Sequence, residues 1–298
     1  MSAPDFPAWS ALALARVEQA LTDWVPAAAP ARLGDAMRYA VLDGGKRLRP
    51  LLVLASADAV QGNGSAALRA ACAVELIHAY SLVHDDMPCM DNDVLRRGKP
   101  TVHVQYGEAQ ALLAGDALQA LAFELLTPEG DAVPPAMQAA LCGLLARAAG
   151  AAGMAGGQAI DLASVGRVLT EAELRAMHRL KTGALLQAAV RMGAACAAPA
   201  LPVATRAALD DYGAAIGLAF QVVDDILDVT ADSAQLGKTA GKDAAADKPT
   251  YVSLLGLAEA QALAARLHAQ AHHALDASGL TTAALLRSLA DRVVMREN

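Results

Sequence analysis

The chain has 298 residues, of which 55% are hydrophobic and 3% aromatic, and its formal net charge at pH 7 is −7. The negative charge argues against nucleic acid as the main partner, because surfaces that bind nucleic acid are rich in Lys and Arg. The apolar residues are mainly Ala and Leu, which favour helices over a sheet.

Cysteine usage and the absence of targeting signals predict a cytoplasmic protein. The four cysteines lie far apart and form no CxxC pair, which is typical of reduced thiols. The amino terminus lacks a basic segment followed by an apolar one, so we expect no signal peptide. No uninterrupted apolar run approaches ~20 residues, so we also expect no membrane span.

Hydrophobic periodicity and Gly/Pro punctuation predict about ten helices and no strand. In chain order, the expected helices cover residues 9–24, 32–42, 48–60, 65–87, 108–126, 135–158, 171–195, 205–227, 251–277 and 282–294. Gly44-Gly45 stops the second of these helices, and Pro88 ends the fourth. The predicted fold class is therefore an all-α bundle.

Two acidic clusters stand apart from each other in this apolar chain. They are Asp85-Asp86-Met87-Pro88-Cys89-Met90-Asp91 and Asp224-Asp225-Ile226-Leu227-Asp228. Carboxylates with apolar flanks cost too much desolvation to be kept without a partner. The clusters therefore predict a shared set of hard divalent cations, which in turn need an anionic ligand such as a diphosphate.

The spacing within each cluster fits metal binding. On a helix, the outer two aspartates of the second cluster share a face, and the middle one can reach the same Mg²⁺-sized target. In the first cluster, Asp91 would point away from Asp85 on an unbroken helix. Pro88 disrupts the helix, so we expect a helix end or bulge that gathers Asp85 and Asp91 on one ion. The alternative, a solvated acidic face, fits the apolar flanks poorly.

Basic residues alternate with the acidic clusters. Lys46, Arg47 and Arg49 follow Gly44-Gly45 at a helix start, where free N–H groups and cations together make a phosphate site. A second basic patch, Arg96-Arg97-Gly98-Lys99, directly follows the first acidic cluster. Either could be a plain surface patch. Together they predict two anionic groups, one bound through metal and one bound directly by Arg and Lys.

Three further segments are candidates for the same site. Lys238, Lys242 and Lys248 occupy a Gly-rich acidic stretch beside the second cluster, which suggests a mobile lid that adds charge to a bound diphosphate. Lys181-Thr182 falls within an expected helix. Gly156-Gly157-Gln158-Ala159-Ile160-Asp161 fits either a helix–helix contact or a hydrogen-bond support.

The chain resembles the short-chain trans-isoprenyl diphosphate synthases, of the bacterial farnesyl diphosphate synthase type, from about Tyr39 to Leu257. The motifs that carry the resemblance are Gly44–Pro50, His84–Asp91, Arg96–Thr101, Gly156–Gln158, Lys181–Gly183, Phe220–Asp228 and Asp247–Tyr251. The resemblance implies one polyprenyl synthase domain over residues 1–298, with about ten helices around a central cavity, and a homodimer. It also implies Mg²⁺-dependent condensation of isopentenyl diphosphate with dimethylallyl and geranyl diphosphate to (E,E)-farnesyl diphosphate.

The resemblance also implies a role for each matching residue. Two or three Mg²⁺ ions would be held by Asp85, Asp86, Asp91, Asp224, Asp225 and Asp228. The allylic diphosphate would contact Arg96, Lys181 and Lys238, with help from Lys248. The diphosphate of isopentenyl diphosphate would bind Lys46, Arg49, His78 and Arg97, although His78 taken alone would usually be a core residue. Thr182 and Gln221 would face the developing allylic cation and complete the catalytic set.

Product length is expected to depend on residues one turn before Asp85, where the growing tail should run. Bulky Tyr80 should block extension, and small Ser81 should leave some depth, which with the family pattern implies a C15 product. Geranyl and geranylgeranyl products stay open, because they differ only in pocket depth.

Three other functions fit the sequence less well. A terpene cyclase would not need the second diphosphate site. A non-catalytic subunit of a heteromeric synthase should have lost its aspartate clusters. A metal phosphohydrolase would need further histidine ligands, and His103 and His178 sit in no ligand-like spacing.

Overall fold

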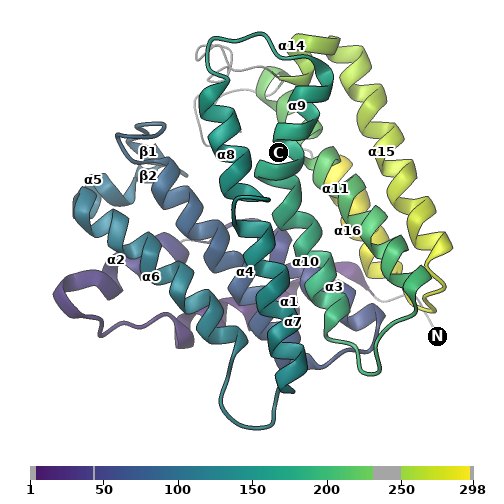
Figure 1. The fold of residues 1–298 in the computed structure, drawn as a ribbon, viewed down its shortest axis with the longest axis horizontal. Coiled ribbons are helices and arrows are strands. Elements are labelled where there is room, and N and C mark those ends of the chain that lie inside the picture. The colour runs from purple at the N-terminus through teal and green to yellow at the C-terminus, as the bar shows by residue number, and fades with distance from the viewer. Residues whose placement is uncertain (1–4, 43, 231–249, 296–298) are drawn as a thin grey trace.

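The computed structural model describes residues 5–42, 44–230 and 250–295, and nearly all of their regular structure is helical, as predicted (Figure 1). The helices are α1 (Phe6–Trp24), α2 (Leu33–Val41), α3 (Leu48–Ala59), α4 (Gly64–Asp85), α5 (Val102–Tyr106), α6 (Glu108–Leu126), α7 (Pro135–Ala149), α8 (Met154–Ala163), α9 (Glu171–His178), α10 (Ala184–Ala195), α11 (Val203–Thr230), α14 (Tyr251–Leu255), α15 (Leu257–Ala277) and α16 (Ala284–Val294). A 3₁₀ turn, η1 (Pro30–Arg32), precedes α2. A π-helical turn, η2 (Arg179–Gly183), joins α9 to α10.

Several helices begin at residues whose side chains satisfy the free N–H groups of the first turn. The side chain of Asn63 accepts a hydrogen bond from the backbone N–H of Ala66 at 2.9 Å and so caps α4. Thr170 and Glu173 form a capping box at the start of α9, and Thr250 forms one with Ser253 at the start of α14.

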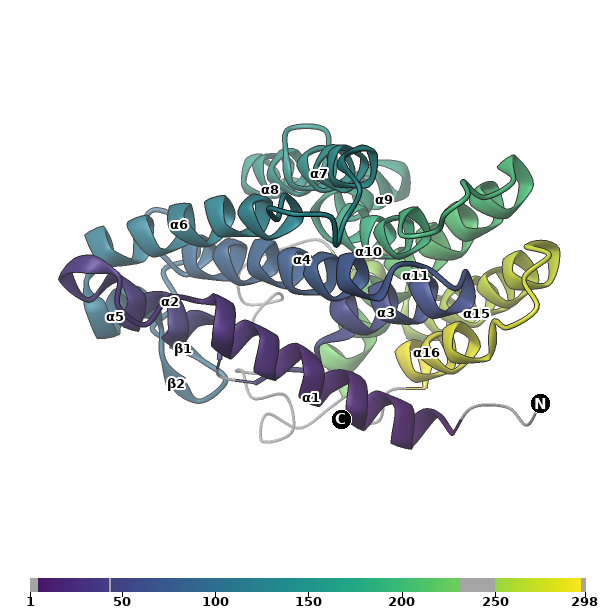
Figure 2. The same ribbon diagram turned by 90° about the horizontal axis from the view of Figure 1, so that it is seen from below.

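Helix α4 is the centre of the bundle. It packs against α6, α3, α10 and α1, and Figure 2 shows it between α1 on one side and α6 and α7 on the other. Small residues such as Ala70, Ala71 and Ala73 are fully buried along it, which lets neighbouring helices approach closely. A second group, in which α11 packs against α10, α15 and α16, completes the core.

The structure differs from the sequence prediction in three places. The expected helix over 135–158 is two helices, because the chain breaks at Gly150–Gly153, where a side chain on Gly153 would overlap the carbonyl of Ala148. The expected helix over 171–195 contains the π turn η2. The prediction of no strand is wrong for one antiparallel hairpin, β1 (Leu95–Arg96) and β2 (Lys99–Pro100). Arg97 and Gly98 form its turn, both with positive φ, as a tight hairpin requires.

Three stretches are long and apolar enough to cross a membrane when only length and composition are considered. They are Gly64–Asp85, Glu108–Leu126 and residues 135–163, which cover α7 and α8. In Gly64–Asp85, 72% of the apolar window is buried inside the protein, because α4 is the central helix of the core. The expectation of no membrane span stays a prediction.

Candidate functional site

The first acidic cluster lies where α4 ends and the chain turns back. Asp85 is the last residue of α4, and its carbonyl accepts a hydrogen bond from the backbone N–H of Asp91 at 2.8 Å. The backbone N–H of Asp93 likewise donates to the carbonyl of Asp86 at 3.1 Å. The helix end predicted from Pro88 is therefore present, and it holds the backbones of Asp85 and Asp91 together.

The carboxylates of this cluster are destabilised in their charged form. Burial raises the pKa of Asp85 to about 6; the Lys181 ammonium opposes the shift, and the neighbouring Asp91 adds to it. Burial also raises the pKa of Asp86, although Arg96 opposes that shift. Desolvated carboxylates that repel one another are stabilised by a shared cation, so this donor set fits a hard divalent ion.

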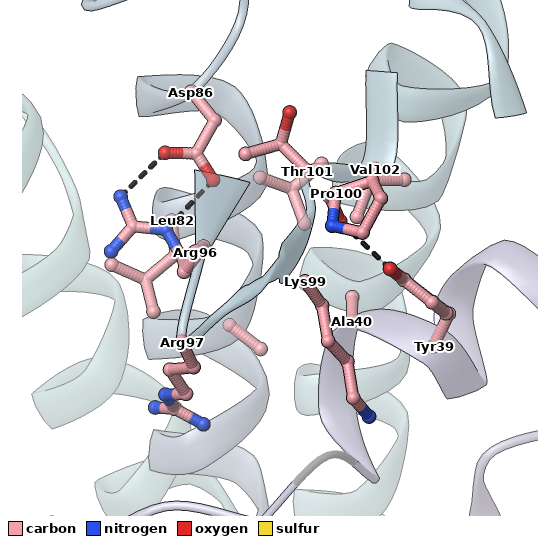
Figure 3. Close-up of a pocket in the computed structure, with 12 residues that line it drawn as sticks. Tyr39, Ala40, Leu82, Asp86, Arg96, Arg97, Lys99, Pro100, Thr101 and Val102 are labelled. Atoms are coloured by element: carbon pink, nitrogen blue, oxygen red, sulfur yellow. Dashed lines mark hydrogen bonds and ion pairs between the residues drawn. The ribbon is translucent and has the colours of Figure 1, made fainter. Parts of the chain in front are cut away.

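Asp86 and Arg96 form a bidentate ion pair (Figure 3). The Arg96 Nε donates to one carboxylate oxygen of Asp86 at 2.7 Å, and a terminal nitrogen donates to the other. The sequence assigned Asp86 to a metal and Arg96 to a diphosphate, whereas the structure pairs them with each other. A ligand of either residue therefore has to compete with the other.

A cavity of about 380 Å³ opens beside this cluster. It is lined by Arg49 from α3, by His78, Tyr80, Ser81, Leu82, His84 and Asp85 from α4, by Met90, by Met154, Ala155, Gln158, Ala159 and Leu162 from α8, and by Lys181 and Thr182 from η2. Five of these residues are site candidates named from the sequence, and they come from three separate segments: Arg49, His78, Asp85, Lys181 and Thr182. The lining also includes Tyr80 and Ser81, the two expected chain-length residues.

The Arg49 and His78 end of the cavity is electropositive. Burial lowers the pKa of His78 well below its usual value, and the nearby guanidiniums of Arg49 and Arg97 lower it further. Burial also lowers the pKa of Arg49. A terminal nitrogen of Arg97 donates to the carbonyl of Gly44, which brings the hairpin against the loop that carries the exposed Lys46. These four residues fit an anionic ligand, because the three cations repel one another until an anion neutralises them and the histidine can donate a hydrogen bond.

Arg47, the remaining cation of that loop, has a structural role. Its side chain is buried and donates to Glu18 of α1 at 2.7 Å, to Glu75 of α4 at 2.8 Å and to the carbonyl of Val41. The expectation that Lys46, Arg47 and Arg49 together supply a phosphate site is therefore wrong for Arg47.

The π turn η2 carries Lys181 and Thr182 to the cavity. The Lys181 ammonium forms an ion pair with Asp161 of α8, and the Thr182 hydroxyl donates to the Oε1 of Gln221 at 3.1 Å. A side chain on Gly157 would overlap the backbone of Lys181, so Gly157 is the helix–helix contact that the sequence left open. π turns inside helices frequently mark functional sites.

The second acidic cluster lies near the end of α11, on the far side of Thr182. The Nε2 of Gln221 donates to one oxygen of Asp225 at 2.8 Å, and the backbone N–H of Tyr251 donates to the other at 2.7 Å. Asp225 and Asp228 are buried, and Asp224 is partly buried. None of the three aspartates lines the cavity among the described residues. Asp225 is connected to the cavity by hydrogen bonds, first to Gln221 and from Gln221 to Thr182 in the cavity wall. Lys238, Lys242 and Lys248 lie outside the described residues.

Two residues of the segment from Gly156 to Asp161, which the sequence left open between a helix contact and a hydrogen-bond support, belong to the site. Gln158 lines the cavity, and neither polar atom of its amide has a hydrogen-bond partner among the residues that the structure describes. Asp161 lies one turn later on α8 and holds Lys181. The spacing of three residues shows that both share a face of α8, but only tertiary packing shows what that face meets.

The chain is similar to several known proteins over most of its length. A family model described as polyprenyl synthetase matches residues 30–281. A probable farnesyl diphosphate synthase of Bradyrhizobium diazoefficiens is 52% identical over 268 residues, 89% of this chain and 80% of that one. The heterodimeric geranylgeranyl pyrophosphate synthase large subunit 1, chloroplastic, of Arabidopsis thaliana is 45% identical over 287 residues, 95% and 77%. A Helicobacter pylori geranyltransferase structure, complexed with magnesium and isoprenyl diphosphate, is similar with a TM-score of 0.84 and 34% identity, and covers 99% of this chain and 98% of that one.

Proposed function

Because this chain belongs to the polyprenyl synthetase family, we propose that it condenses isopentenyl diphosphate with dimethylallyl and then geranyl diphosphate, giving (E,E)-farnesyl diphosphate and diphosphate. Family membership makes the chain a prenyltransferase that elongates prenyl chains, and the C15 product is the proposed part. The observation that carries the proposal is the cavity in which Asp85, Lys181 and Arg49 surround an apolar space. A cytoplasmic homodimer is part of the same proposal.

The six aspartates of the two clusters would hold two or three Mg²⁺ ions. The raised pKa of Asp85 supports this, since a divalent cation relieves the desolvation and repulsion of gathered carboxylates. The magnesium in the Helicobacter pylori structure supports the choice of metal. When bound, Mg²⁺ supplies electrostatic stabilisation to the departing diphosphate.

The chain's own residues would act on the allylic substrate at both ends of the breaking C–O bond. Lys181, with Arg96 and Lys238, would bind the diphosphate and stabilise the charge that grows on it. The Thr182 hydroxyl and the Gln221 amide, which the 3.1 Å hydrogen bond orients, would present weak dipoles to the allylic cation. Apolar walls would exclude water, which would otherwise quench that cation.

The second diphosphate would bind directly to cations, at Lys46, Arg49, His78 and Arg97. With its pKa well below the usual value, His78 is neutral at pH 7 and can still donate one hydrogen bond. The isopentenyl double bond then attacks the allylic carbon and a proton leaves. Each carboxylate near the cavity is committed elsewhere in this scheme, so the released diphosphate would accept the proton.

Geranylgeranyl diphosphate is the second candidate product, and the relative of that name in Arabidopsis thaliana is the observation that favours it. The side chains of Tyr80 and Ser81 in the cavity wall support the shorter product, because Tyr80 takes up space that a fourth isoprene unit would need. A non-catalytic subunit is disfavoured by the two intact aspartate clusters.

A product assay tests the proposal. The full chain is incubated with isopentenyl and dimethylallyl diphosphate, with Mg²⁺ or with EDTA, and the products are dephosphorylated and separated by chromatography. We expect a C15 alcohol with Mg²⁺ and no product with EDTA. A C20 main product would favour the second candidate, and activity that persists in EDTA would refute the metal-based mechanism.

A further inference from the structure

Two histidines and an aspartate meet on the two last helices, on elements that contribute nothing to the lining of the cavity. His268 and His272 lie one turn apart on α15 and share a face. Their Nε2 atoms are 3.1 Å apart, and they lie 2.7 and 2.8 Å from the same oxygen, Oδ1 of Asp291 on α16. Three potential metal donors therefore converge on one point from two helices.

We propose that His268, His272 and Asp291 form a binding site for a transition-metal dication of the Zn²⁺ class, which would join α15 to α16. The site is distinct from the aspartate clusters, and the proposal does not depend on the proposed function. Two imidazoles and one carboxylate are a common protein ligand set for Zn²⁺, with a water molecule in the fourth position.

The distances fit a tetrahedral ion after a small adjustment. Ligand atoms about 2.0 Å from Zn²⁺ lie ~3.3 Å from one another in a tetrahedron. The Nε2 atoms of His268 and His272 already have nearly this separation. The Asp291 oxygen is about 0.5 Å too close to each nitrogen, as expected for hydrogen bonds instead of coordination. The Asp291 side chain is 43% exposed, so it has room to move outward.

The charges around the three residues permit a dication. The Oδ1 of Asp291 lies within hydrogen-bond distance of the Nε2 atoms of both imidazoles, so it faces the point where an ion would bind. A terminal nitrogen of Arg287 lies 3.3 Å from the Nδ1 of His272. Arg287 also forms an ion pair with Asp276. When His272 binds a metal through Nε2, its Nδ1 carries the proton and no longer accepts from Arg287, but the ion pair with Asp276 still holds the guanidinium.

The choice of metal follows from ligand chemistry. Imidazole nitrogen favours Zn²⁺, Co²⁺, Ni²⁺ and Cu²⁺, whereas Mg²⁺ prefers oxygen ligands. A large excess of Mg²⁺ should therefore occupy the aspartate clusters and leave this site to the transition metal. An ion that bridges α15 and α16 should raise the melting temperature, since it binds only when the two helices are packed together.

The test is metal binding to the full chain, produced without a polyhistidine tag and stripped with EDTA. The protein is dialysed into excess Mg²⁺ and then titrated with Co²⁺, whose visible absorption reports tetrahedral nitrogen and oxygen coordination, and with Zn²⁺ by calorimetry. We expect one equivalent of either ion to bind and Zn²⁺ to raise the melting temperature.

Variants locate the ion. His272→Gln keeps a hydrogen-bond donor for Asp291 but removes a metal ligand. Loss of a residue that only orients a ligand typically weakens metal binding ~10–100-fold, so we expect this variant to weaken Zn²⁺ binding at least as much. His268→Gln should do the same. The matched control is His273→Ala, an exposed neighbour of His272 on the same helix, which should bind as the unchanged chain does. Absence of binding under excess Mg²⁺, or equal binding by His272→Gln and His273→Ala, would overturn the proposal.

Discussion

At the scale of single residues, the wall of the cavity combines one bulky and one small side chain. Tyr80 and Ser81 are neighbours on α4, one turn before Asp85, and both line the cavity. The Ser81 hydroxyl donates to the carbonyl of His78 at 2.9 Å, so it is turned back onto its own helix and leaves space beside it. The space next to Ser81 and the bulk of Tyr80 should therefore act on product length in opposite directions.

Substitutions at these two positions should change the product in opposite directions. Ser81→Phe fills the space, and we expect the main product to shorten toward C10. Tyr80→Ala opens the wall, and we expect longer products. Chromatography of the dephosphorylated products measures both, with Leu113→Ala, an exposed position on α6, as the control. If both variants made the same chain lengths as the unchanged protein, Tyr80 and Ser81 would not limit the product.

At the scale of elements, a buried ion-pair network ties the first helix to the central one. Arg47 joins Glu18 of α1 to Glu75 of α4, and the side chains of Arg47 and Glu75 are 3% and 5% exposed. A buried carboxylate that loses its cation is strongly destabilised, because neither water nor a partner then compensates its charge. This network explains why Arg47, which follows Gly44-Gly45, does not line the cavity as Arg49 does.

Arg47→Met should therefore lower stability far more than it affects substrate binding. We expect the free energy of unfolding to fall by about 3–5 kcal/mol, with an unchanged KM for isopentenyl diphosphate in the protein that remains folded. Denaturant unfolding and steady-state kinetics measure the two quantities. Arg32→Ala is the matched control, because its ion pair with Asp35 is exposed and should be worth less than about 1 kcal/mol. A large rise in KM with little change in stability would instead make Arg47 a substrate ligand.

At the scale of the whole molecule, His178 should make stability depend on pH. Burial lowers the pKa of His178 to about 4, and the nearby Lys181 adds to this effect, whereas Asp161 opposes it. The unfolded chain takes up a proton at this residue near pH 6.5, but the folded chain does so only near pH 4. The contribution of neutral His178 to the free energy of unfolding is therefore fully present above about pH 6.5, and it is lost as the pH falls toward about 4.

The loss should be on the order of 3 kcal/mol, which is the pKa difference expressed as free energy. His178→Phe keeps a ring against Tyr251, whose ring centre is 5.6 Å away, and cannot titrate. We expect this variant to show a smaller drop in unfolding free energy between pH 6.5 and pH 4, measured by denaturant titration in EDTA. Equal slopes for the variant and the unchanged chain would contradict the assignment.

The helical fold and much of the candidate site were predictable from the sequence, because both depend on local patterns. Alanine-rich periodicity predicted the all-α architecture, and Pro88 predicted the helix end beside Asp85. The partners of charged residues were not predictable, because the local sequence does not show that Arg47 pairs with Glu75 or that Arg96 pairs with Asp86. The hairpin was missed because a positive φ at Arg97 carries no sequence signal.

The histidine pair on α15 is a pattern that the sequence shows but that could not be interpreted without the packing of the helices. The spacing of His268 and His272 is a helical ligand spacing that is visible in the sequence, and the sequence analysis passed over it. What the sequence does not contain is the position of Asp291, which depends on how α16 folds back onto α15. A spacing becomes a site only when packing supplies the third donor.

In the proposed site, the bidentate contact between Asp86 and Arg96 would make the binding of the cation and the binding of the phosphate group interdependent. A cation that binds the Asp86 carboxylate would release the Arg96 guanidinium from its bidentate partner, so that Arg96 could bind an incoming phosphate group. By reciprocity, a phosphate group that attracts Arg96 exposes Asp86 to the cation. The cation and the phosphate group should therefore bind with positive cooperativity, because each of them breaks the same ion pair and so raises the affinity for the other.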